Sequence, residues 1–218
     1  MKKDTDNNVG IAFFIIGSIT SFIDLLTEPL ITLGLPLIIY ILLTQKQKIS
    51  LKQDIMNFIK LCILWCLGYA LTWIAKWIIV SIIYNRDIIQ NALQQAKFRS
   101  TGMKQYGYLF VINKNLKFLS PVVTSINLAL IIIYSIIKLI KNRNCKINIK
   151  QNFYTIIPFI FLGLLPFVWY LVLRQHSYIH TFFTYKILII TIISIFIITD
   201  KILEPEHKGN ENERRKDY

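Results

Sequence analysis

The chain has 218 residues, of which 54% are hydrophobic and 17% are charged, and its formal net charge at pH 7 is +13. A water-soluble domain carries about 25% charged residues and fewer apolar ones. Because the apolar residues are gathered in blocks of about 20, the length of a membrane span, the composition excludes a soluble enzyme, a disordered chain and a coiled coil.

The fold class that these blocks predict is all-α, a polytopic helical integral membrane protein with one helical domain over residues 1–199. The first apolar region, residues 9–43, is interrupted by two carboxylates followed by a proline: Asp24, Glu28 and Pro29. The residue before a proline avoids the helical region. We therefore expect two elements, residues 11–26 and 30–43, joined by a turn at residues 27–29. Both are short for a full crossing, and the first could instead lie at the membrane interface.

Four later stretches are long enough to cross a membrane, namely residues 58–84, 119–140, 154–173 and 181–199. Pro158 and Pro166 lie inside the third stretch and predict a kink there. Together with the first region, the chain has about six hydrophobic segments, which places both termini on the same side. Five crossings with an interfacial first helix is the alternative, and it would place the amino terminus outside.

The connection before the second long stretch contains an amphipathic pattern over residues 87–98. Apolar residues recur there at helical spacing, with glutamines and an asparagine on the other faces. We expect this helix to lie along the outer membrane surface, where Arg86, Lys97 and Arg99 would face lipid phosphates.

The distribution of lysine and arginine predicts the orientation. Residues 44–57, residues 141–152 and the tail after residue 199 are all basic, and alternating spans would place them on one side, which is then cytoplasmic. The connection over residues 85–117 is also basic, although it falls on the opposite side, and this weakens the prediction of orientation from lysine and arginine. The carboxyl terminus is expected in the cytoplasm, with residues 200–218 forming a charged, disordered tail.

Two sets of titratable residues are candidates for catalysis. Asp24 and Glu28 are four residues apart, so on one helix face Asp24 could act as a base or could bind a divalent cation with Glu28. The alternative is that both carboxylates mark the end of a short helix. His176 and His180 have the same spacing and could position an acceptor or move a proton. No third ligand is close in sequence, so no metal site is predicted; the alternative is a polar connection between spans.

Basic and aromatic residues are candidates for substrate binding. Lys76, Arg86 and Arg174 would neutralise a phosphate, while Tyr178 and Tyr185 could stack on a sugar. The alternative for Lys76 is that its ammonium reaches the lipid headgroups beside two tryptophans. All of these residues are predicted near one membrane face, and titratable groups gathered between helices are typical of a site.

Partners and cofactors follow from the same features. The basic residues lie mostly beside apolar spans, so the expected partners are membrane lipids rather than nucleic acid. No dinucleotide, Walker or zinc-protease motif is present, and the cofactor is unknown.

Three passages carry a resemblance: residues 17–36, residues 75–77 running into 91–93, and residues 176–186. They resemble the carboxyl-terminal portion of a group of longer, uncharacterised bacterial polytopic membrane proteins, which implies a bacterial cytoplasmic membrane. At fold level the architecture is also loosely similar to polyprenyl-phosphate-dependent glycosyltransferases.

Two functional hypotheses follow. The first is a membrane component of cell-envelope glycan or lipid handling, which recognises a lipid-linked phosphate or sugar, such as a polyprenyl-phosphate carrier, at the outer face and could have glycosyltransferase-like activity. The second is a non-catalytic subunit for transport, immunity or assembly whose polar residues stabilise helix packing.

Overall fold

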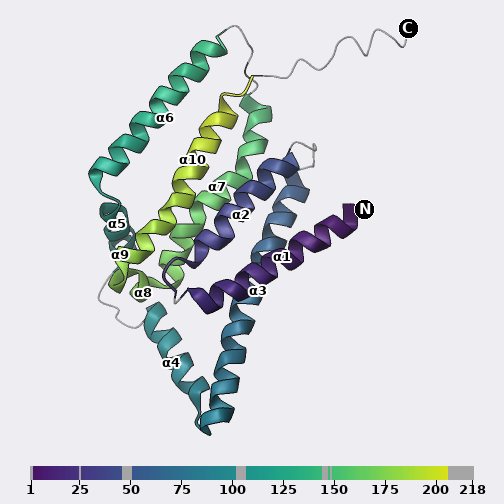
Figure 1. The fold of residues 1–218 in the computed structure, drawn as a ribbon. Helices are drawn as coiled ribbons and strands as arrows, with labels where there is room; N and C mark the ends of the chain where they lie inside the picture. The colour runs from purple at the N-terminus through teal and green to yellow at the C-terminus, as the bar shows by residue number, and fades with distance from the viewer. Residues whose placement is uncertain are drawn as a thin grey trace.

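The computed structural model describes residues 2–24, 26–45, 51–101, 107–143, 147 and 149–205. Within these residues the chain forms ten α-helices and one short 3-10 helix and contains no β-strand (Figure 1). The all-α fold class predicted from the sequence is confirmed.

The helices follow one another with short connections. In chain order they are α1 (Lys2–Ile23), α2 (Pro29–Gln45), α3 (Leu51–Tyr84), α4 (Ile88–Thr101), α5 (Tyr108–Phe118), α6 (Pro121–Lys141), α7 (Ile149–Val172), α8 (Arg174–Ile179), α9 (Thr181–Thr184), η1 (Tyr185–Ile187) and α10 (Leu188–Ile202).

Four stretches of the described residues are long and apolar enough to cross a membrane: Leu51–Tyr84, Pro121–Lys141, Asn152–Val172 and Thr181–Ile202. They correspond to the four long stretches expected from the sequence. The two shorter apolar helices, Asn7–Ile23 and Pro29–Gln45, correspond to the two short elements. The protein is therefore membrane-embedded, while the choice between five and six crossings stays a prediction.

The observed bounds differ from the expected ones in three places. Helix α7 begins at Ile149, before the expected residue 154, and contains both Pro158 and Pro166, while the kink expected there stays a prediction. Helix α5 forms in the part of the connection where no element was expected. Helix α10 extends to Ile202, so Asp200 belongs to a helix, where Lys138 of α6 forms an ion pair with it. The part of the expected tail after residue 205 lies outside the described residues.

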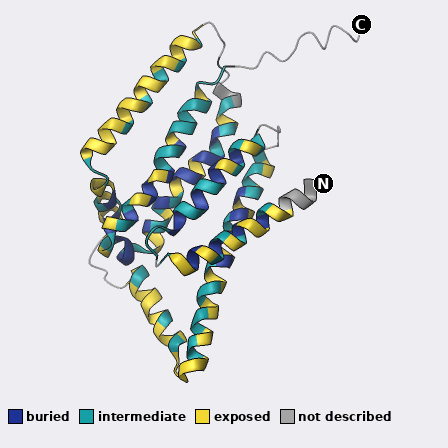
Figure 2. Cartoon of the chain, viewed as in Figure 1, coloured by how far each residue is buried: buried dark blue, intermediate teal, exposed yellow. Residues whose placement is uncertain are grey.

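The core lies between α2, α7 and α10. Leu37, Phe159 and Ile190 are fully buried there, and Gly34 leaves the space that the Ile190 side chain occupies. Figure 2 shows buried residues along these three helices and also where α1 meets α3. By contrast, the described residues of α6 include no buried side chain, so most of the surface of this apolar helix is exposed.

Helix α1 crosses α3 at two glycines. A Cβ atom added to Gly17 would lie 2.1 Å from the carbonyl oxygen of Trp65, and one added to Gly68 would lie 2.1 Å from that of Phe14. Only glycine permits so close an approach of two helix backbones. The Ser18 hydroxyl donates a hydrogen bond to the Gly68 carbonyl across the crossing.

Side-chain hydrogen bonds join the connections at each end of the bundle. At one end Gln45 donates to the Thr155 carbonyl, and Asn152 donates to the Glu204 carbonyl. At the other end the turn between α1 and α2 lies beside α8, with α4 and α5 close by (Figure 1). The candidate site residues of α8 therefore lie at the second end.

Candidate ligand-binding site between α3 and α4

Helices α3 and α4 diverge from the turn that joins them (Figure 1). A cavity of about 640 Å³ lies between them. This volume is within the range of roughly 300–1,000 Å³ found for small-molecule sites. Residues from four parts of the chain line it: Leu26, Tyr69, Ala70, Trp73, Ile74, Trp77, Ile88, Asn91, Ala92, Gln95, Ala96, Arg99 and Leu173.

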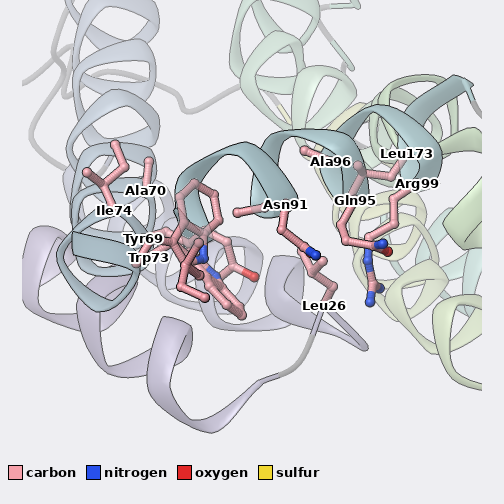
Figure 3. A pocket seen from close by; sticks show the side chains of 13 residues that line it. Leu26, Tyr69, Ala70, Trp73, Ile74, Asn91, Gln95, Ala96, Arg99 and Leu173 are labelled. Carbon is pink, nitrogen blue, oxygen red and sulfur yellow. The ribbon is translucent and has the colours of Figure 1, made fainter. Parts of the chain in front are cut away.

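The lining is apolar on the α3 side, whereas the α4 side contributes both apolar and polar residues. The α3 wall consists of aromatic and aliphatic side chains, including Trp73 and Ile74. On α4, Asn91, Gln95 and Arg99 follow one another at intervals of four residues, which places them on one face. Figure 3 shows these three side chains pointing to the same side, toward Leu26. The cavity thus combines hydrocarbon-like walls with a polar strip that ends at Arg99.

Arg99 is the cation at the end of this strip. Its Nη1 atom lies 3.0 Å from Nδ1 of His176. None of the ion pairs among the described residues includes Arg99, so its guanidinium makes no direct contact with a carboxylate there. A half-buried guanidinium has five N–H groups and accepts no hydrogen bonds, so several donors remain for an anion.

His176 positions the Arg99 side chain through a hydrogen bond. The ring is 3% exposed, and its Nε2 atom lies 2.7 Å from the carbonyl oxygen of Leu26. Because a carbonyl can only accept and a guanidinium can only donate, the proton of His176 must be on Nε2, and Nδ1 accepts from Arg99. Burial lowers the pKa of His176 from 6.5 to about 4, and the nearby His180 and Arg99 act in the same direction. His176 is therefore a neutral residue whose two nitrogens are both occupied.

Asp24 shapes the turn that presents the Leu26 carbonyl. One carboxylate oxygen accepts a hydrogen bond from the Thr27 amide at 2.7 Å, and the other accepts from the Glu28 amide at 3.0 Å. Leu26 has a φ of 67°, a conformation that costs a non-glycine residue about 1–2 kcal/mol. The bonds to Asp24 offset this cost and keep the carbonyl directed at His176.

A smaller chamber of about 70 Å³ adjoins the cavity. The two spaces share Gln95 and Arg99, and the chamber is completed by Phe98, Gln175, His176, Ile179 and His180. The ring of His180 lies 4.6 Å from that of His176, centroid to centroid. Unlike His176, His180 has no side-chain hydrogen bond to any described residue and lines the chamber with its nitrogens unoccupied.

Lys76 and Glu28 form contacts within the chain. The Lys76 ammonium donates to the Ser21 carbonyl at 2.6 Å and lies 4.0 Å from the centroid of the Phe22 ring, so it caps the last turn of α1. Glu28 forms an ion pair with Lys186 at 2.5 Å, which ties the start of α2 to η1. Neither group faces the Arg99 site.

The other predicted binding residues are distributed around α8. Arg174 donates to the Thr101 carbonyl at 3.4 Å and lies 4.8 Å from the Tyr108 ring. The Tyr178 ring is covered by the Lys114 ammonium at 3.7 Å. Tyr185 packs on Phe118, with ring centroids 5.2 Å apart.

Arg86 stands apart from all of these. It is exposed in the turn between α3 and α4, at the opposite end of α4 from Arg99. A helix of this length separates the two by roughly 20 Å. The structure thus brings together Asp24, His176 and His180 near Arg99 but leaves Arg86 outside the site.

The sequence reasoning assigned no site role to the polar strip of α4 or to Gln175. Arg99 was expected to face lipid phosphates on the surface, whereas it faces inward onto His176. The available signal was the interval of four between Asn91, Gln95 and Arg99, which places three polar side chains on one face of the helix. No comparable pattern marks Gln175, because its position depends on the packing of α8 against α4.

Comparisons with known proteins identify no relative of this chain. No family model matches the chain, and neither the curated proteins nor the solved structures include a match. Among the described residues, no group of three His, Cys, Asp or Glu side chains is placed to hold a metal ion. The site must therefore be interpreted from its own chemistry.

Proposed function

We propose that the protein recognises a lipid-linked phosphate or sugar in the membrane, as a component of bacterial cell-envelope glycan or lipid handling, and that the cavity between α3 and α4 is the binding site. The observation that carries the proposal is that the apolar cavity ends at Arg99, a cation that forms no ion pair with a carboxylate among the described residues. An amphiphile with a hydrocarbon chain and an anionic head is complementary to this arrangement.

Each part of the cavity suits one part of such a ligand. The walls around Trp73 and Ile74 would bury the first part of a polyprenyl chain, at about 25 cal/mol for each Å² of apolar surface. Arg99 would bind the phosphate, because a guanidinium can donate two parallel hydrogen bonds to phosphate oxygens. His176 would keep the guanidinium in place. In this proposal Arg99 takes the role that the sequence assigned to Lys76 and Arg86.

His180 is the residue that would move a proton in a reaction at this site. It lines the chamber next to Arg99 and has no side-chain hydrogen bond to a described residue. His176 is unsuited to this role while both of its nitrogens are occupied, and Asp24 is bonded to the turn. The proposal places the site at the outer membrane face, with the carboxyl terminus in the cytoplasm.

The direct test is lipid binding to the purified protein in nanodiscs. Undecaprenyl phosphate should bind saturably, and Arg99→Gln should weaken the affinity at least tenfold because a charge-assisted hydrogen bond contributes about 1.5–3 kcal/mol. Lys97→Gln is the matched control, since Lys97 is an exposed cation two residues away on the same helix. Equal binding by wild type and Arg99→Gln would exclude the proposed site.

A second candidate function is a non-catalytic subunit of a transport, immunity or assembly system. The observation in its favour is that Asp24, Glu28 and Lys76 all form contacts within the chain. This hypothesis expects Asp24→Asn and His180→Gln to change protein abundance without changing any lipid-dependent activity. The binding hypothesis expects His180→Gln to change the activity at normal abundance.

A further inference from the structure

The chamber on the far side of Arg99 is a separate compartment of the site. We infer that it is a subsite for one phosphate group, so that the lipid bound between α3 and α4 is a phosphomonoester. This inference rests on the proposed function and specifies the head of its ligand. Three observations support it: the position of the Gln175 carboxamide, the volume of the chamber and the chemistry of its lining.

Gln175 is the first of these observations. The residue is 3% exposed and lines the chamber, yet its carboxamide forms no hydrogen bond with any described residue. The carboxamide is not among the enclosed side-chain atoms of the described residues that lack a partner, so its polar atoms reach the open space of the chamber, where water or a ligand can satisfy them. A polar partner inside the chamber would satisfy this carboxamide. Gln95 contributes a second carboxamide to the chamber from the α4 side.

The size of the chamber limits that partner. Its volume is about 70 Å³, and one water requires about 10–15 Å³ on the same measure, so roughly five water-sized positions are present. Four oxygens around a central atom fit such a space. A hexose ring with its hydroxyl groups does not, so a sugar attached to the phosphate would have to lie outside the chamber.

The lining is rich in hydrogen-bond donors and includes no carboxylate. Arg99 contributes a full positive charge, the two carboxamides contribute N–H groups, and His180 contributes a ring nitrogen. A phosphomonoester carries close to two negative charges at neutral pH, with three terminal oxygens to accept these donors. A phosphodiester has one charge and two such oxygens, so it would leave part of the donor set unpaired.

The geometry also gives the direction of the ligand. The large apolar cavity and the chamber meet at Gln95 and Arg99, which line both. A lipid chain between α3 and α4 would therefore pass its phosphate between these two side chains. The rest of the lipid would extend past Trp77 toward the α3–α4 turn.

A competition experiment on the full chain in nanodiscs tests the subsite. Labelled undecaprenyl phosphate would be displaced by the unlabelled lipid, by undecaprenol, by the phosphodiester phosphatidylglycerol and by inorganic phosphate. We expect the monoester to compete at least tenfold better than the diester or the uncharged alcohol, and inorganic phosphate to compete far more weakly because it lacks the chain.

Two variants remove carboxamide donors of the chamber, one at Gln175, which lines the chamber alone, and one at Gln95, which lines both spaces. We expect Gln175→Leu and Gln95→Leu each to weaken monoester binding about tenfold while leaving undecaprenol binding unchanged. Gln95 is exposed, so Gln95→Leu keeps the test decisive if the buried substitution impairs folding. The control is Gln94→Leu, one residue away, exposed and absent from both linings.

The outcomes separate the two proposals. If the monoester and the diester compete equally and both glutamine variants bind normally, while Arg99→Gln still weakens binding, the subsite is refuted and the proposed function stands. If none of the lipids binds saturably, the proposed function fails as well. Inorganic phosphate competing as well as the lipid would overturn the assignment of a lipid and leave free phosphate as the ligand.

Discussion

The Nε2 atom of His176 donates a hydrogen bond to the carbonyl oxygen of Leu26, at 2.7 Å and across 150 residues of sequence. The same ring accepts a hydrogen bond from Arg99. Three segments, the α1–α2 turn, α4 and α8, are thus joined through one imidazole. Any change that protonates this ring must break one of the two bonds, because a protonated imidazole can only donate.

This relationship predicts how stability depends on pH. The pKa of His176 is lowered by burial to about 4, whereas the unfolded chain has its usual value of 6.5. As the pH falls from 6.5 toward 4, the unfolded state takes up the proton first, so the free energy of unfolding decreases over this window. The groups that face the ring, Arg99, His180 and Asp24, remain in the variant described next.

The measurement is thermal unfolding in detergent at pH 7 and at pH 5, on wild type and on His176→Gln. We expect the decrease between the two pH values to be larger in the wild type, because glutamine does not titrate. The carboxylates titrate in both proteins and cancel in the comparison. An identical pH dependence in the two proteins would show that His176 is not held in its neutral form.

The glycine crossing predicts a strong effect of one methyl group. In Gly68→Ala the new Cβ atom would lie 2.1 Å from the Phe14 carbonyl oxygen, so α1 and α3 must separate. We expect a loss of at least about 1–3 kcal/mol in the free energy of unfolding. Gly107→Ala is the control because a Cβ atom there meets nothing within 4 Å. Equal melting temperatures of the two variants would contradict this description of the crossing.

Lys76 provides a test between a structural and a ligand-binding role. Lys76→Met retains most of the aliphatic stem but removes the hydrogen bond to the Ser21 carbonyl, and we expect a loss of about 1–3 kcal/mol in stability. Lys52→Met, at an exposed lysine of the same helix, should have little effect. The affinity for undecaprenyl phosphate should be unchanged. If Lys76→Met had normal stability but a weakened affinity for the lipid, the structural role would be contradicted and Lys76 would be a ligand-binding residue.

The helices could be predicted from the sequence because each membrane span is encoded locally. A block of about 20 apolar residues needs no tertiary information to be helical in a bilayer, since every backbone group must be satisfied within the segment. The turn at residues 27–29 was predictable for the same local reason, because two carboxylates and Pro29 interrupt the apolar run. The structure adds the carboxylate's bonds to the Thr27 and Glu28 amides.

The site could be predicted only in part, because it depends on how distant helices pack. The sequence placed Asp24, His176 and His180 near one another through their position at the span ends. It could not show that Arg99 faces inward, because both faces of α4 carry polar residues, and the exposed positions include the apolar Leu93. Nor could it show that Lys76 reaches Ser21, which depends on the crossing of α1 and α3.

Photo-crosslinking tests the central claim, that a lipid chain lies between α3 and α4 with its phosphate at Arg99. A polyprenyl phosphate carrying a diazirine on its first isoprene unit would be photolysed with the protein in nanodiscs, and the labelled residues identified by mass spectrometry. We expect labelling of Trp73, Ala92 and Ala96, which line the cavity, and loss of this labelling in Arg99→Gln. Labelling confined to exposed residues of α6 and unchanged in Arg99→Gln would contradict the account.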